Sequence, residues 1–462
     1  MTPPIRARDF APHAYTPSSG DARYSVTHYR LDLDYTPRTN RLQGTATLSV
    51  RVLEPTKSLR IDLIGLRAGK VRVDGRAHKQ VTQDGRALQL QFGAALAAGS
   101  TLTVGIDYAG RPAPVRSRWG QIGWEELENG ALVASQPIGA PTWFPCNDRV
   151  DDRAGYEISF TCDREFFVAA TGKPGPVTTK GGRRTWNFAT EVPTATYLVA
   201  VHVGEYAEQS IGAARVLAPP RAASRVGRAF APVPRMLAVF EDWFGAYPQD
   251  DLTIVVVEEE LEIPLEAQGM ATFGLNHCAP QEQRLIAHEI AHQWFGNSVG
   301  IGRWEDIWLN EGFACYAEWV WSEASGGPSI AECAERHHAR LAAAPQRQVL
   351  ADPGPARMFD DWVYKRGALL LETLRRRMGD AAFRALMLRW ATEWRHRLAT
   401  TADFIALAEA LSPEALSPEP KGTGPMGTEP LSTESFSTEP LAGVWQAWLH
   451  EAPLPALPPR AT

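Results

Sequence analysis

Residues 281–296 read QEQRLIAHEIAHQWFG. Apolar residues recur along it at helical spacing, which predicts a helix over 281–295. Four residues turn an α-helix by about 400°, so His288 and His292 leave one face only about 40° apart. Glu289 follows the first of them. Two imidazoles on one helix face, with a carboxylate beside them, are typical of a site for one divalent metal ion.

A second predicted helix carries an acidic residue that can complete this site. Its segment LNEGFACYAEWVW contains Glu311, which lies 19 residues after His292. A helix, a loop and a returning helix would bring Glu311 to the metal, and two imidazoles with one carboxylate favour zinc. The layout with a third His six residues after His292 is excluded, because that position is Ser298. The plainer alternatives are a solvated surface helix and a Glu311 that serves only as a helix-start charge.

Composition limits the class of protein. The chain has 462 residues, a net charge of -6 and 22% charged residues, which predicts two or three globular domains and no nucleic-acid partner. The N-terminus lacks the apolar core of a secretory signal, and no apolar run is long enough for a membrane span. Five scattered cysteines favour a reducing compartment. We therefore expect a cytoplasmic protein with no membrane partner, and we favour a monomer.

The pattern changes along the chain and predicts five regions. Short segments rich in β-branched and aromatic residues, separated by turns, indicate a β-rich domain over 21–207 after a tail at 1–20. Helical patterns at 281–295, 309–324 and 365–378, with a buried strand in DLTIVVVEEE, indicate a mainly helical domain over 208–411. Residues 412–440 are rich in Pro, Ser, Thr, Gly and Glu and are predicted to be a disordered linker. Residues 441–462 regain apolar residues and are expected to dock on the body.

Two stretches together resemble a known family. HEIAHQWFGNSV (288–299), followed by WEDIWLNEGFACY (304–316), is similar to the aminopeptidase N family of zinc metallopeptidases, the gluzincins. The resemblance implies that His288, His292 and Glu311 bind one Zn²⁺ per chain. It also implies that Glu289 is the general base of the reaction.

Three further segments fit the resemblance. Ile263-Pro264-Leu265-Glu266-Ala267 is similar to the family's GAMEN segment in its glutamate alone, which implies that Glu266 binds the substrate's free α-amine; Glu260 and Glu262 are rivals for that role. Pro264 lacks an N–H and would remove one backbone donor.

Tyr364, in the segment YKRGA (364–368), corresponds to the tyrosine that stabilises the oxyanion, and Arg366 there replaces the usual Lys. The segment SQPIGAPTWFPCNDRVDDRAGYEISF (135–160) resembles the family's segment before the catalytic domain. The resemblance implies that Gln136 helps to bind the N-terminus and that WFPCND (143–148) forms a structural corner.

The resemblance covers about residues 20–411 and implies an α+β multidomain fold. A β-rich N-terminal sandwich or saddle domain would precede a thermolysin-like, mainly helical zinc peptidase domain, in a short form without the family's large C-terminal helical domain. The implied activity is zinc-dependent removal of N-terminal residues from peptides with a free N-terminus. Two alternatives stay open: a thermolysin-like endopeptidase and a catalytically silent zinc-binding interaction module.

Overall fold

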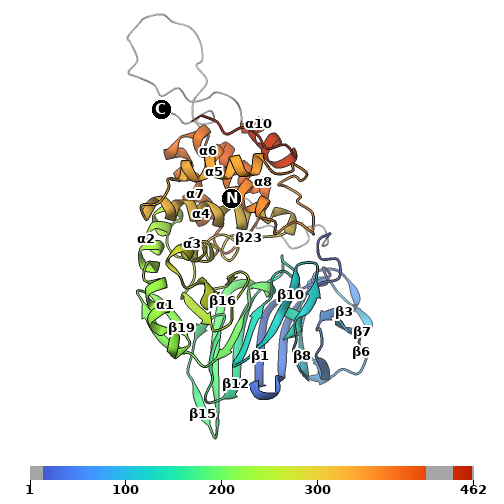
Figure 1. Ribbon diagram of the computed structural model, residues 1–462. Coiled ribbons are helices and arrows are strands. Elements are labelled where there is room, and N and C mark those ends of the chain that lie inside the picture. Colours follow the sequence, from blue (N-terminus) through green and yellow to red (C-terminus); the bar gives the residue numbers. More distant parts are fainter. Residues whose placement is uncertain (1–13, 413–440, 460–462) are drawn as a thin grey trace, which may run out of the picture. The chain divides into compact units, whose positions relative to one another are not determined.

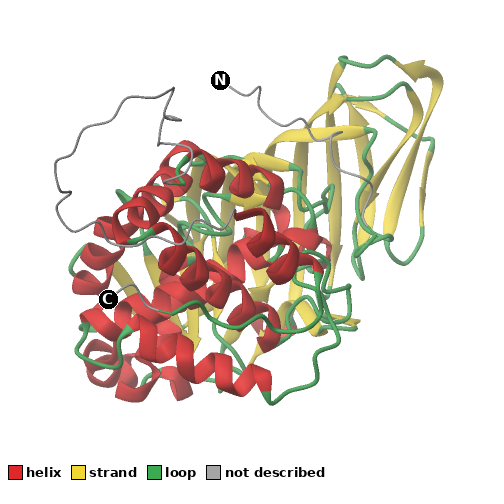
Figure 2. Cartoon of the chain, turned by 90° about the horizontal axis from the view of Figure 1, so that it is seen from above, coloured by secondary structure: helices red, strands yellow, loops and turns green. Residues whose placement is uncertain are grey.

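The computed structural model describes residues 14–412 and 441–459, which divide into two compact units (Figure 1). The first unit draws its described residues from Met1–Arg235, Pro248–Gln293 and Gly302–Trp304. The second draws them from Met236–Tyr247, Trp294–Ile301 and Glu305–Thr462. Strands dominate the first unit and helices the second (Figure 2). The linker predicted at 412–440 lies, apart from Ser412, outside the described residues.

A large sheet forms the body of the first unit. Within the described residues it has nine strands in the order β14-β16-β12-β1-β2-β8-β4-β5, with β15 paired to β16. Alternate residues of its long strands are buried, as the period of two in their sequences requires. The strands are β1 (Tyr24–Thr36), β2 (Arg41–Val52), β4 (Arg67–Val73), β5 (Arg76–Ala77), β8 (Thr101–Gly110), β12 (Arg153–Asp163), β14 (Lys173–Pro174), β15 (Thr178–Lys180) and β16 (Arg183–Ala195).

Two smaller sheets share the core of the large one, which is built from Leu, Val, Ile, Tyr and Trp side chains. One has the order β13-β17-β11-β10-β9 and the other β3-β7-β6. Their strands are β3 (Thr56–Asp62), β6 (Val81–Gln83), β7 (Ala87–Leu96), β9 (Val115–Ser117), β10 (Gly120–Leu127), β11 (Gly130–Ala134), β13 (Phe167–Ala170) and β17 (Val201–Gly204).

A further sheet of the first unit carries the segment that contains Glu266. Its order is β18-β19-β20-β22-β21, so β21 is the last strand at one edge. Its strands are β18 (Ala207–Ile211), β19 (Ala214–Ala218), β20 (Thr253–Val257), β21 (Leu265–Ala267) and β22 (Met270–Gly274). The helices α1 (Ala223–Phe230) and α3 (Gln283–Ala291) belong to the same unit.

The second unit is a group of helices around an aromatic core. Phe295, Phe313, Trp390 and Phe404 contact one another there, with ring centroids 4.7 to 6.3 Å apart. The helices are α2 (Val233–Phe244, from Met236 onward), α4 (Trp308–Ala324), α5 (Ile330–Ala342), α6 (Asp361–Met378), α7 (Asp380–Glu393), α8 (Thr401–Ala410), α10 (Leu441–Trp445) and the π-helix η9 (Gln446–His450). The short strands β23 (Gly300–Ile301) and β24 (Leu398–Ala399) pair with each other.

Short 3-10 helices connect many of these elements. They are η2 (Pro37–Thr39), η3 (Ala140–Thr142), η4 (Thr196–Leu198), η5 (Pro220–Ala222), η6 (Leu275–His277), η7 (Pro280–Glu282) and η8 (Trp304–Asp306).

The β-rich first part and helical second part predicted from the sequence are confirmed, while the bounds of the predicted helices differ. The helix predicted over 281–295 ends at Ala291, because Gln293 turns its N–H back to the carbonyl of Ile290 and Gly296 adopts a positive φ of 110°. The helix predicted to begin at residue 365 begins at Asp361. None of the described helices is both long and apolar enough to cross a bilayer.

Candidate functional site

The metal-binding motif lies at the C-terminal end of α3. His292 is the C-cap, but its backbone stays helical (φ -58°, ψ -24°) and its N–H bonds to the carbonyl of His288. The four-residue spacing therefore still brings His288 and His292 to the same side of the helix. Their ring centroids lie 4.7 Å apart, with an angle of 79° between the ring planes. Both rings are buried, and so is the side chain of Glu289 between them in sequence.

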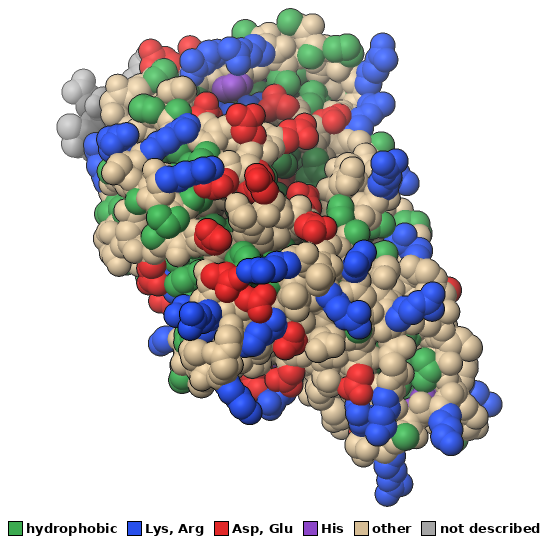
Figure 3. Space-filling view, turned by 60° about the horizontal axis from the view of Figure 1, so that its bottom comes forward, with side chains coloured by type: hydrophobic (Ala, Val, Ile, Leu, Met, Phe, Trp, Pro, Cys, Tyr) green, Lys and Arg blue, Asp and Glu red, His purple; other side chains and the backbone are tan. Residues whose placement is uncertain are grey.

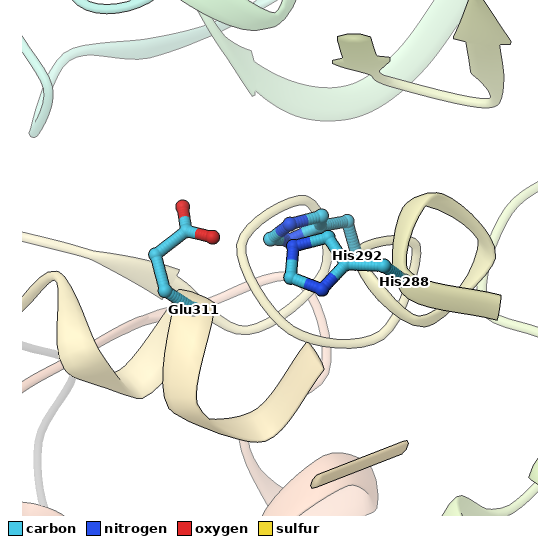
Figure 4. Close-up of side chains that lie close together, drawn as sticks. All are labelled: His288, His292 and Glu311. Atoms are coloured by element: carbon cyan, nitrogen blue, oxygen red, sulfur yellow. The ribbon is translucent and has the colours of Figure 1, made fainter. Parts of the chain in front are cut away.

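Glu311 joins the two histidines from the first turn of α4. One ligand atom from each of His288, His292 and Glu311 lies within 4.8 Å of the others, and all three side chains are buried. Figure 4 shows the three side chains directed toward a common space. Two imidazole nitrogens and one carboxylate oxygen are a zinc-type donor set. The structure thus brings together the three residues expected to bind the metal.

The start of α4 is held within the second unit by a buried polar contact. The Asp306 carboxylate accepts hydrogen bonds from the Thr401 hydroxyl (2.6 Å) and from the Thr401 N–H (3.2 Å). The Trp308 indole N–H donates to the same hydroxyl at 2.9 Å. These bonds fix the helix turn on which Glu311 stands.

Gln136 and Glu266, which the family resemblance implies bind a substrate amine, are in contact. The Gln136 side-chain amide donates a hydrogen bond of 2.7 Å to the Glu266 carboxylate. Glu266 lies in the edge strand β21 and is half-buried, whereas Glu260 and Glu262 are exposed in the loop before it. Pro264 precedes β21, so its missing N–H falls outside the strand.

Gln293 lies immediately after the motif and was not predicted from the sequence to be part of the site, but its side chain makes hydrogen bonds that hold the site together. Its side chain accepts a hydrogen bond from the Gly269 N–H (2.9 Å) and donates one to the Ala267 carbonyl (3.1 Å). These bonds join the end of α3 to the hairpin of β21 and β22. The sequence offers one signal for this role, a Gln directly after the second histidine, but it does not show which groups the side chain contacts.

Tyr364 lies in the first turn of α6 and is half-buried. The structure places this helix against α4, which carries Glu311. Gly312 and Gly367 meet there so closely that a Cβ added to either would lie 2.8 Å from the other's Cα. Because Glu311 is on α4 and Tyr364 is on α6, the close packing of the two helices at these glycines fixes the positions of the two residues relative to each other within the second unit.

The outer surface carries charges of both signs. Figure 3 shows Lys and Arg side chains interspersed with Asp and Glu side chains over the face in view, in keeping with a net charge of -6.

Comparisons with known proteins agree with this geometry. Residues 25–198 match the model of the peptidase M1 N-terminal domain, and residues 228–417 match that of the peptidase family M1 domain. The chain is 26% identical to human endoplasmic reticulum aminopeptidase 1 over 403 residues, which are 78% of this chain and 42% of that protein. It is 25% identical to aminopeptidase M1-C of Oryza sativa subsp. japonica over 88% of this chain and 50% of that protein. The chain thus spans half or less of the length of these relatives.

Solved structures match over nearly the whole chain. The M1 zinc metallopeptidase from Deinococcus radiodurans is 28% identical, with a TM-score of 0.82 over 96% of this chain and 98% of that one. A mutant of that metallopeptidase has been solved bound to a Tyr-Ser-Ala substrate. The yeast LTA4 hydrolase, 20% identical with a TM-score of 0.77, covers 99% of this chain and 73% of its own and shares the fold.

Proposed function

Because the chain belongs to peptidase family M1, we propose that it is a zinc-dependent aminopeptidase that hydrolyses the first peptide bond of peptides with a free N-terminus. The grouping of His288, His292 and Glu311 around one space, next to the carboxylate of Glu289, is the observation that carries the proposal. The Tyr-Ser-Ala complex of the Deinococcus relative supports a peptide as substrate.

The three grouped residues fit a zinc ion. Catalytic zinc is held by three protein ligands and keeps a fourth position open, and His₂Glu is one of the established sets. Ligand atoms within 4.8 Å of one another need only a small inward movement to reach the bond lengths of about 2.0–2.2 Å that zinc requires. When bound there, zinc would supply Lewis acidity and an acidified water of pKa about 7.

Glu289 is proposed as the general base. It follows His288 on α3 and is buried with it, so its carboxylate is held at the same end of the helix. In this role Glu289 takes a proton from the attacking water and then gives it to the leaving amine. Such acid–base catalysis contributes about 10²–10⁴-fold to rate.

Tyr364 is proposed as a donor to the oxyanion that forms on the substrate carbonyl. A phenol is protonated at neutral pH and can donate one hydrogen bond. Its place in the first turn of α6, where that helix packs on α4, keeps the donor on a rigid element. Removal of one such donor costs about 3–4 kcal/mol in other hydrolases.

Glu266, oriented by Gln136, is proposed as the anchor for the substrate's α-ammonium group. The 2.7 Å bond from Gln136 leaves the carboxylate in a defined orientation at the sheet edge. A peptide can add to that edge through backbone hydrogen bonds, which places its N-terminus at Glu266. An ammonium bound at a fixed place limits cleavage to the first peptide bond.

Paired substrates test the amine anchor. We expect hydrolysis of a tripeptide with a free N-terminus and none of its N-acetylated form, because only the free amine pairs with Glu266. Glu266→Gln should raise KM and lower kcat/KM at least about 10-fold, a loss typical of a charge-assisted hydrogen bond. Glu262→Gln, in the exposed loop nearby, is the matched control and should leave both constants unchanged. Equal cleavage of both peptides would instead indicate the endopeptidase.

A second measurement tests the chemistry of the metal site. Hydrolysis of an aminoacyl-anilide should stop with a chelator and return with Zn²⁺. Glu289→Gln should keep one zinc per chain but lose about 10²-fold or more in kcat. Activity that survives metal removal would disprove the zinc mechanism, and a zinc-loaded but inert wild type would indicate the silent module.

We infer activity as a monomer, because the three proposed metal ligands meet within one chain. We also infer a reducing compartment such as the cytoplasm, because all five cysteines are buried free thiols. Thiol titration of the unfolded protein should find five reactive groups, and sedimentation should give the mass of one chain.

A further inference from the structure

Arg366 contacts the C-terminal residues through its whole guanidinium group. The side chain is fully buried. Its nitrogens donate to backbone carbonyls of one short stretch: Nε to Trp448 (2.9 Å), Nη1 to Ala452 (2.8 Å), and Nη2 to Ala447 (2.9 Å), Glu451 (2.5 Å) and Pro453 (3.4 Å). We call residues 441–459, which comprise α10, η9 and the extended stretch after them, the C-terminal brace.

The chemistry of this contact suits arginine in particular. Carbonyls at the end of a helix lack partners within it and carry partial negative charge, and η9 ends beside Arg366. A guanidinium offers five donors in a rigid fork, whereas a lysine ammonium offers three on one atom. The rings of Trp362 and Trp448 add to the enclosure at 4.8 and 5.9 Å from the guanidinium carbon. Burial lowers the pKa of Arg366 to about 10, so the group stays charged at neutral pH.

The rest of the brace is attached to α5 and to the C-terminal half of α6. The Pro455 carbonyl lies 2.7 Å from Nε2 of His338 on α5, and the Pro458 carbonyl accepts a hydrogen bond of 2.9 Å from Arg376 on α6. Arg366 is therefore the contact that ties the brace to the first two turns of α6.

The same turns of α6 are held by α4 as well. Gly367 meets Gly312, the residue after Glu311. Lys365 Nζ lies 3.2 Å from the Cys315 sulfur and 3.6 Å from the Glu318 carboxylate, both on α4. Residues 365–367 are thus fixed by α4 and by the brace, and Tyr364 directly precedes them.

We propose that Arg366 is a positioning residue: by tying the start of α6 to the C-terminal brace, it fixes the Tyr364 hydroxyl relative to Glu311. This inference rests on the proposed function, in which Tyr364 donates a hydrogen bond to the oxyanion. The catalytic part of the second unit then depends on residues more than 70 positions further along the chain.

A double-mutant cycle on the full chain tests the proposal, with kcat and KM for an aminoacyl-anilide as readouts. Arg366→Met should lower kcat about 10- to 100-fold with little change in KM, because a misplaced catalytic group costs rate rather than binding. In a Tyr364→Phe background the same change should lower kcat less than about 2-fold, because the group it positions is already gone. Arg366→Lys keeps the charge and loses the fork, and it should fall between wild type and Arg366→Met.

The control is His338→Ala, which removes a contact of the brace with α5 and leaves α6 intact. It should retain wild-type kcat. Zinc content and unfolding temperature are measured for every variant, and Arg366→Lys replaces Arg366→Met in the cycle if the latter does not fold.

The outcomes separate this inference from the proposed function. Equal losses of kcat for the Arg366 variant in both backgrounds, or no loss in either, would overturn the positioning role alone. Unchanged kcat in Tyr364→Phe by itself would remove Tyr364 from the mechanism and with it the positioning role, while the proposed zinc-dependent aminopeptidase activity, which rests on the metal site, would stand. Loss confined to the background that retains Tyr364 would establish Arg366 as the residue that positions it.

Discussion

Each unit buries a group of charged side chains, and the two groups should respond to pH in different ways. In the first unit, burial raises the pKa of Asp62 to about 6, that of Asp152 to about 7 and that of Asp148 to about 8. In the second unit, burial lowers the pKa of Arg366 to about 10, which still leaves it charged at neutral pH. Burial also opposes the charge on Lys365, but Cys315, Glu318 and Asp361 outweigh it and raise the lysine's pKa above its usual value.

The buried charged groups of the first unit therefore titrate near neutral pH, whereas those of the second unit stay charged. Between pH 5 and pH 8 the three carboxyl groups change protonation while Lys365 and Arg366 remain cations. The buried carboxyl groups close the corner after η3, where the Asn147 amide donates to Asp152 at 2.7 Å and the Thr196 hydroxyl donates to Asp148 at 2.6 Å. We therefore expect pH to act on stability through the first unit, and charge removal to act most strongly in the second.

The largest expected effect is the pH dependence that Asp148 contributes. Its pKa is raised by burial and by Asp62, against the hydrogen bond from Thr196 and the charges of Arg86 and Arg60. The folded state therefore holds a proton that the unfolded state releases near pH 4, and the free energy of unfolding falls as pH rises toward 8. At about 1.4 kcal/mol per pKa unit, this one group can account for up to about 4 kcal/mol between pH 5 and pH 8.

Asp148→Asn mimics the protonated side chain and should flatten that slope. Denaturant unfolding at pH 5 and pH 8 measures it, with Asp32→Asn as control because Asp32 is half exposed beside Arg30 on the large sheet. The control should keep the wild-type slope. Parallel slopes for Asp148→Asn and wild type would show that Asp148 is ionised in the folded protein.

A second effect, of similar size, should come from removal of the buried cation. Lys365 and Glu318 are both buried, with 3.6 Å between Nζ and the carboxylate. Lys365→Met leaves the Glu318 carboxylate without this cation, and loss of one partner of a buried pair costs about 3–5 kcal/mol. Unfolding at pH 8, where Lys365 is still charged, measures the loss. Addition of Glu318→Gln to the variant should recover part of it; no recovery would mean that Lys365 contributes by packing alone.

Much of the fold could be predicted because its signals are local. The run TIVVV forms the fully buried strand β20, and the partly alternating segment VTHYRLDLDY (26–35) lies within β1. Long segments with a clear period leave little choice of element. Helix ends were less predictable, since the end of α3 depends on a turn at Gln293 that apolar spacing does not record.

In the candidate site, the sequence predicted the feature that depends on spacing within one helix. It did not predict the contacts between segments that are distant in the chain. The pairing of His288 with His292 follows from helix geometry alone, and Glu311 was placed by the resemblance and by topology. The hydrogen bond of Gln136 to Glu266 joins residues 130 positions apart, and Arg366 looked like a mild replacement of Lys. Its contacts with the C-terminal brace depend on tertiary structure that no local pattern contains.

The smallest of the three effects concerns the glycine crossing of α4 and α6. An alanine Cβ at Gly367 would lie 2.8 Å from the Gly312 Cα, well inside the 3.5–4.0 Å at which carbon atoms attract. In an open helix Gly→Ala gains about 0.5–1 kcal/mol, but overpacking against backbone costs about 1–3 kcal/mol. We therefore expect a net loss of stability for Gly367→Ala, together with weaker zinc binding because Glu311 adjoins Gly312.

Gly443→Ala in α10 is the control, because nothing lies within 4 Å of the new Cβ. It isolates the helix-propensity gain and should be neutral or stabilising. Equal behaviour of the two variants would show that the second unit can shift α6 away from α4 at no cost.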